Sequence, residues 1–118
     1  MKFDLLFDVR ARVSIANLCR DKKFENFGEL WTCAESDIIK NTLKVLKIMS
    51  NSAEYAKRKA QGLEVNVNAD YNAIPLTEAD LYDMMSYELD ELQEEIVEVI
   101  KRDSVQSVKA KEGKKKAK

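Results

Sequence analysis

Apolar positions along the chain recur mostly at intervals of three and four residues. The clearest stretch is residues 38–49, where they form two adjoining rows: Ile38, Thr42, Val45 and Met49, and Ile39, Leu43 and Leu46. This spacing places the apolar side chains on one face of a helix. The pattern therefore predicts an amphipathic helix that packs against a core.

Before this helix, the pattern predicts two shorter ones. Residues 9–19 form the first, with Asp8 placed to cap it, and residues 24–31 form the second. At the start of the chain, Phe3, Leu5 and Phe7 fall at every second position, so a short N-terminal strand or strand pair is compatible with the pattern.

The ends of the central helix are marked by residues with capping chemistry. Ser36 suits its N-cap, and Gly62 suits a left-handed stop at its C-terminus. The polar residues 50–52 either interrupt this helix or start a second piece, with Asn51 and Glu54 as the capping pair.

The second half begins with residues 62–74, whose alternation predicts a short strand or an extended loop. Thr77 and Asp80 then resemble a capping box that opens a new helix. A last helix over residues 88–100 carries an apolar row at spacings of three, four and three: Leu89, Leu92, Ile96 and Val99. This narrow row predicts packing on one surface, either a partner protein or a second copy in a homo-oligomer. The alternative is that the row closes the core of the monomer.

Residues 104–118 lose the apolar periodicity and become rich in lysine, which predicts a disordered tail. Together these patterns predict a mainly α fold of about four to six helices over residues 1–103. The chain has only three Gly and one Pro, too few for the turns of an all-β fold.

Charge is strongly segregated although the net charge is only −1. Residues 1–59 hold 12 basic and 8 acidic residues, residues 60–100 hold 11 acidic and no basic ones, and residues 101–118 hold 8 basic and 2 acidic ones. We interpret the acidic half as a solvated face and the lysine-rich end as a solubilising segment.

The sequence offers no catalytic machinery, so we expect a protein that is not an enzyme. It contains no histidine, the most common general base. Cys19 and Cys33 alone cannot complete a zinc site, and three isolated glycines cannot build a phosphate loop. We therefore predict no catalytic residues, no metal site and no cofactor. The acid at Asp4 argues against a secretory signal, and no stretch has the apolar length of a membrane span.

The layout of residues 3–102 resembles the tail assembly chaperones of long-tailed phages. The segments that carry the resemblance are Phe-Asp-Val-Arg-Ala-Arg at 7–12, the aromatic and glycine stretch 24–31, Pro-Leu-Thr-Glu-Ala-Asp-Leu at 75–81, and the acidic helix 89–100. The resemblance implies a non-enzymatic chaperone in the host cytoplasm. Its implied role in virion assembly is to bind the tape-measure protein, and with it the tail-tube protein, during phage tail assembly.

Members of that family are often extended by programmed ribosomal frameshifting. The run Gly113-Lys114-Lys115-Lys116 requires a GGN codon followed by three AAA or AAG codons, on which ribosomes can slip. The resemblance thus implies a longer frameshifted product.

Two rival functions remain open. The basic tail and the positive N-terminal half would suit a nucleic-acid-associated regulator, although the tail lacks aromatic residues for base stacking. A generic helical adaptor subunit is the other rival.

Overall fold

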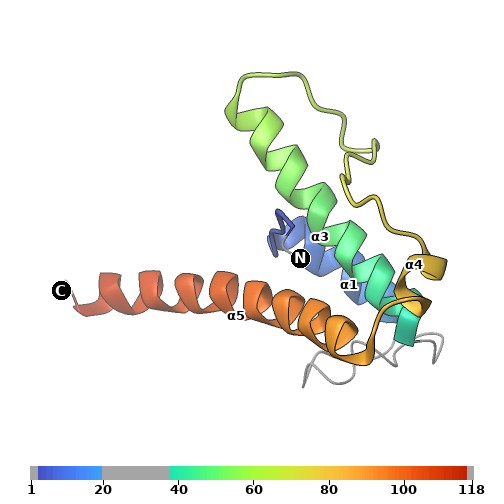
Figure 1. Cartoon of the computed structure of the whole chain (residues 1–118). Helices are drawn as coiled ribbons and strands as arrows, with labels where there is room; N and C mark the ends of the chain where they lie inside the picture. Colours follow the sequence, from blue (N-terminus) through green and yellow to red (C-terminus); the bar gives the residue numbers. More distant parts are fainter. Residues whose placement is uncertain (1–2, 20–37, 117–118) are drawn as a thin grey trace.

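Helices dominate the computed structural model, which describes the backbone of residues 3–19 and 38–116 and, within these ranges, the side chains of residues 3–18 and 38–104. The elements are α1 (Val9–Cys19), α3 (Ile38–Ala60), α4 (Glu78–Tyr82) and α5 (Ser86–Lys116) (Figure 1). The two described ranges contain no strand, so the mainly helical fold is confirmed. The helix predicted over residues 24–31 and the cap at Ser36 lie outside the described residues.

A single hydrophobic core joins the N-terminal segment, α1, α3, α5 and the segment that follows α3. Its buried members are Leu5, Ala11, Ile15, Val45, Leu46, Met49, Ile74, Leu92, Ile96, Val99 and Ile100. Full burial of one Leu or Ile side chain stabilises a fold by about 1.5–3 kcal/mol. The helices are therefore held together chiefly through this shared cluster.

The start of α1 has the predicted cap. Asp8 Oδ1 accepts a hydrogen bond from the Ala11 N–H at 2.9 Å, and the Asp8 carbonyl accepts one from the Arg12 N–H. These bonds satisfy donors that the first helical turn would otherwise leave unpaired. Behind the cap, Ala11 and Ile15 lie four residues apart and are fully buried.

The central helix α3 runs without a break through the polar residues at positions 50–52. The predicted interruption is therefore wrong. Two of these side chains bind a distant part of the backbone instead: Ser50 Oγ accepts from the Ala73 N–H at 3.0 Å, and Asn51 Oδ1 accepts from the Tyr71 N–H at 2.6 Å. Ser50 and Asn51 bind the segment that returns along α3, so they do not cap a second helix.

Gly62 ends the helix as predicted. Its φ of +78° is in the left-handed region that glycine adopts without penalty. The Leu63 N–H donates to the Arg58 carbonyl at 3.0 Å, as in a Schellman motif.

The return segment, residues 61–77, runs back along α3 to α4 (Figure 1). It is a loop, so of the two predicted conformations the strand is excluded. Asn66, Asp70 and Asn72 each accept a hydrogen bond from the backbone N–H two residues later. These Asx turns satisfy the backbone locally, which removes the need for a strand partner. Ile74 then anchors the segment in the core.

Thr77 caps α4 through the predicted capping box with Asp80. The Thr77 N–H donates to Asp80 Oδ2 at 2.8 Å, and the Asp80 N–H donates to Thr77 Oγ1 at 3.3 Å. The cap fixes the direction of this five-residue helix, and its Leu81 is buried.

Helix α5 has helical backbone as far as Lys116 and extends well beyond the rest of the chain (Figure 1). The sequence predicts a disordered tail over residues 104–118, and this disorder stays a prediction. Lys, Ala, Gln and Glu all have high helix propensity, which allows a helix to continue where the apolar pattern has ended. The independence of residues 104–118 from the folded domain stays a prediction.

Candidate functional site

The four residues predicted to bind a partner lie mainly inside the molecule. Leu92 is 3% exposed and Ile96 is 0% exposed, and Val99 is also buried. Leu89 is half-buried. We call Leu89, Leu92, Ile96 and Val99 the apolar row. Because three of its members belong to the monomer core, partner binding through the row stays a prediction that requires α5 to leave the core.

A different apolar set is exposed where α4 ends and α5 begins. The Asp83 N–H donates to the Ala79 carbonyl at the end of α4, and Glu88 Oε1 accepts from the Met85 N–H at the start of α5. This tight connection points Leu81 and Met84 toward the protein interior, whereas Tyr82, Met85 and Tyr87 are 66%, 61% and 62% exposed. We call Tyr82, Met85 and Tyr87 the junction patch.

The junction patch lies in an acidic stretch. Residues 78–90 contain five acidic residues and no basic one: Glu78, Asp80, Asp83, Glu88 and Asp90. Tyrosine and methionine are enriched in protein interfaces, while solvated acids at the edge keep such a surface soluble and favour basic partners. The patch can therefore offer apolar contact area within an acidic stretch of the chain.

Sequence reasoning missed this patch. In the sequence, the Met84–Met85 pair suits either core filling, which is the commoner role, or an adaptable binding surface. The structure buries only part of Met84 and leaves Met85 exposed. The signal was present in the spacing, because positions 82, 85 and 87 follow neither a helical nor a strand repeat.

A second surface lies beside the N-terminal strap, which we define as residues 3–7. The strap is neither helix nor strand, and α5 binds its backbone. The Phe3 N–H donates to Glu95 Oε1 at 2.9 Å, and the Phe7 N–H donates to Asp103 Oδ2 at 2.7 Å. Arg102 donates to the Leu5 carbonyl at 3.1 Å. These bonds take the place of the strand pairing that the N-terminal alternation would allow.

Helix α3 holds the other side of the strap. The Leu6 N–H donates to the Met49 carbonyl at 3.1 Å, and Lys57 Nζ lies 2.9 Å from Asp4 Oδ2. The hydrogen bond and charge of Lys57 lower the pKa of Asp4, and Asp4 in turn raises the pKa of Lys57. Both side chains are exposed, so this pair is screened by solvent.

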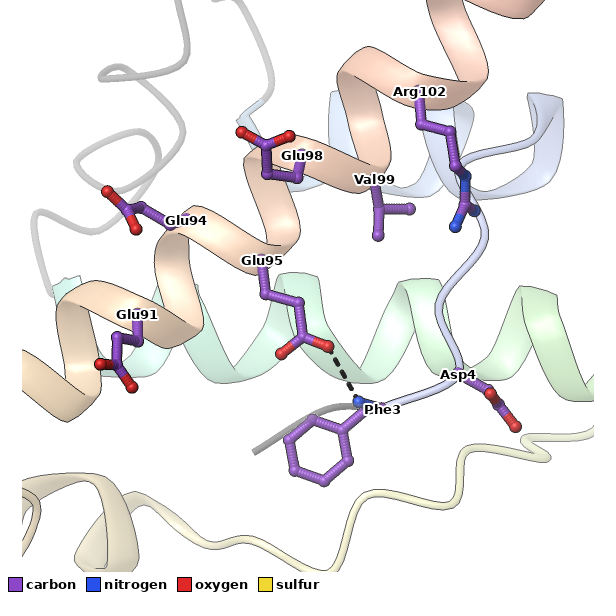
Figure 2. A pocket seen from close by; sticks show the side chains of 8 residues that line it. All are labelled: Phe3, Asp4, Glu91, Glu94, Glu95, Glu98, Val99 and Arg102. Carbon is purple, nitrogen blue, oxygen red and sulfur yellow. Dashed lines mark hydrogen bonds between the residues drawn. The ribbon is translucent and has the colours of Figure 1, made fainter.

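An open acidic groove of about 780 Å³ lies between the strap and α5 (Figure 2). It is lined by Phe3, Asp4, Glu91, Glu94, Glu95, Glu98, Val99 and Arg102. Arg102 is the only base in this lining, and its hydrogen bond with Asp103 raises its pKa. The groove therefore presents an excess of negative charge.

The part of the chain that the structure describes contains no group of three acidic or cysteine side chains placed to hold a metal ion. In the same ranges, every helix is too short or too polar to span a lipid bilayer.

Comparison with known proteins gives no match: no family model, no curated protein and no solved structure is significantly similar to this chain.

Proposed function

We propose that this chain is a non-enzymatic, protein-binding chaperone that works as phage tail assembly chaperones do. In this role it binds the tape-measure protein in the host cytoplasm and keeps it soluble while the tail-tube protein assembles around it. Two things support the proposal: the resemblance in layout over residues 3–102 and the exposed junction patch.

The junction patch is the observation that carries the binding role. Its three large side chains are each more than 60% exposed and lie within six residues of one another. Grouped exposed apolar side chains on a folded protein mark interaction sites, and aromatic residues supply much of the binding energy in interfaces. Burial of these side chains against an apolar helix of the client would remove them from water.

The acidic surroundings support the chaperone role in particular. Between residues 60 and 100 the chain carries 11 acidic residues and no basic one. A strong charge of one sign on the outer face keeps a complex with an aggregation-prone client in solution.

Co-expression tests the proposal. The client in this test is the tape-measure protein of the proposal, and the readout is its soluble fraction with and without the chain. We expect the wild-type chain to keep the client soluble, and Tyr82→Ser/Met85→Ser/Tyr87→Ser to lose this ability. The matched control is Leu63→Ser/Val67→Ser, which removes two comparably exposed apolar side chains from the return segment.

Client solubility and a separate DNA-binding measurement together distinguish the rival functions. Equal client solubility with the wild-type chain and the triple variant contradicts a role for the junction patch. Retention of the chain on DNA at low salt, released as salt rises, would favour the nucleic-acid-associated regulator instead.

The coding sequence gives an independent test of the resemblance. A slippery heptamer over Gly113–Lys116, followed by an open shifted frame, is expected for a tail assembly chaperone. Lysine codons arranged so that the tRNAs cannot re-pair, or immediate stops in both shifted frames, contradict it.

A further inference from the structure

Two arginines, one on α1 and one on α3, are each stacked on a tyrosine ring. Arg10 Cζ lies 3.7 Å from the centroid of the Tyr55 ring, and Arg58 Cζ lies 4.7 Å from the centroid of the Tyr71 ring. The centroids of the two rings are 6.4 Å apart. These four side chains therefore form one continuous cluster, which we call the arginine–tyrosine cluster.

Hydrogen bonds to the backbone fix the outer ring of the cluster. The Tyr71 N–H donates to Asn51 Oδ1 at 2.6 Å, and the Tyr71 hydroxyl oxygen accepts from the Asn66 N–H at 2.9 Å. The ring contacts in turn orient the guanidinium groups. Neither guanidinium group forms a hydrogen bond or an ion pair with any described residue. Two oriented cations therefore keep their N–H donors for an anion from outside the described chain.

The surroundings of the cluster are strongly basic. Helices α1 and α3, taken with the return segment, contain eight basic and three acidic residues. Of these acids, Glu54 lies 3.5 Å from Lys57 Nζ, and Asp70 accepts the Asn72 N–H. The part of the fold with excess positive charge therefore also carries aromatic rings, the feature that the lysine-rich tail lacks.

We infer that the arginine–tyrosine cluster binds single-stranded nucleic acid. The phosphates of a single strand offer paired oxygen acceptors that match the arginine fork, and its unstacked bases can pack on the tyrosine rings. Bases within a duplex are already stacked on one another, so a duplex can use the charge of the cluster but not its rings. The cluster shares no residue with the junction patch, so the inference goes beyond the proposed function.

Fluorescence anisotropy of a labelled polythymidine strand with the full chain tests the inference. At low salt, the wild-type chain should bind this strand at least about tenfold more tightly than it binds duplex DNA or polyglutamate. Arg10→Gln/Arg58→Gln should weaken binding about tenfold or more. It should also reduce the slope of log affinity against log salt by about 1.4, since each phosphate contact on a single strand contributes about 0.7.

The role of the rings is tested at Tyr55. Tyr55→Leu should weaken binding about fivefold or more, because it removes a stacking surface for a base. Tyr55→Phe keeps the ring and should bind as the wild type does. Circular dichroism confirms that each variant is folded. Equal binding by the leucine and phenylalanine variants would contradict stacking and overturn the inference, and so would polyglutamate that binds as tightly as the strand.

Two matched controls remove the same charge outside the cluster. Arg12→Gln/Lys47→Gln changes other basic residues of α1 and α3, and Lys114→Gln/Lys115→Gln changes the lysine-rich tail. Each control should weaken binding less than about threefold, because only weak general attraction is lost. A tail variant that loses as much affinity as the arginine variant overturns the inference and favours the nucleic-acid-associated regulator.

Photo-cross-linking of the wild-type chain to a strand that contains bromouracil gives a readout that needs no variant. Mass spectrometry should find the cross-link on Tyr55 or Tyr71. Cross-links confined to residues 104–118 overturn the inference, and so does a wild-type chain that fails to bind the strand at low salt. Neither result affects client binding by the junction patch, which the co-expression experiment measures.

Discussion

The junction patch and the apolar row are neighbours in the sequence, yet one is exposed and the other is largely buried. Tyr87 and Leu92 lie on the same helix, and their exposed fractions are 62% and 3%. The row follows a helical repeat and closes the monomer core, whereas the patch lies at a change of chain direction. The comparison teaches that regular apolar spacing finds the core of such a protein, and that apolar residues outside the repeat are better candidates for its interface.

The largest expected effect is the difference in stability between a variant with an aspartate in the apolar row and one with an aspartate in the junction patch. Leu92→Asp buries an uncompensated carboxylate and should cost about 4–5 kcal/mol or more, enough to unfold a small domain. Tyr87→Asp places the same group in solvent and should change stability by less than about 0.5 kcal/mol. Urea unfolding followed by circular dichroism measures both. A folded, stable Leu92→Asp variant would show that the row is not part of the core.

A smaller effect tests how the strap fixes α5 over the core. Asp103→Ala removes the acceptor for the Phe7 N–H and should destabilise the chain by about 1–3 kcal/mol. Asp103→Asn keeps an acceptor oxygen at that position, so its loss should be smaller. Equal stability of the alanine variant and the wild type would mean that the strap does not help to hold the helix.

Two buried serines of α3 test how the return segment, which leads to the junction patch, is held against α3. Ser50→Ala removes the acceptor for the Ala73 N–H and should cost about 1 kcal/mol. Ser52 is equally buried, but its hydroxyl has no partner among the described residues, so Ser52→Ala should be neutral or stabilising. Thermal unfolding of the two variants gives the answer, and the reverse order of stability would contradict the assigned bonds.

The smallest effect concerns the exposed pair Asp4–Lys57. The pKa of Asp4 is lower in the folded chain than in the unfolded chain, so its contribution is present above about pH 4. This contribution is lost as the pH falls through the lowered pKa. The raised pKa of Lys57 gives a contribution that is lost only at strongly alkaline pH. Asp4→Asn should therefore lower the melting temperature slightly at neutral pH. A difference from wild type that persists unchanged in strong acid would contradict this assignment.

The features that could be predicted from sequence are those whose partners are close along the chain. The Asp8 cap, the Gly62 stop and the Thr77–Asp80 capping box all depend on bonds between residues three to five positions apart. Residue type and spacing are enough to identify such bonds.

The features that could not be predicted depend on distant partners. The strap bonds to Glu95 and Asp103 join residues more than 90 positions apart, and Ser50 binds a backbone N–H 23 positions away. From the sequence alone, polar residues with distant partners cannot be distinguished from polar residues that contact only solvent. The junction patch was missed for a related reason, since the direction of each side chain at a turn is set by the packing of Leu81 and Met84.

Hydrogen–deuterium exchange of the chain, free and bound to its client, tests the central claim most directly. That claim is that the apolar row stays closed in the monomer while the junction patch binds. We predict slow exchange over residues 92–100 in both states and new protection over residues 82–87 on binding. Faster exchange over residues 92–100 in the complex, without protection at the junction patch, would contradict the claim, because it would mean that α5 opens and binds the client through its apolar row.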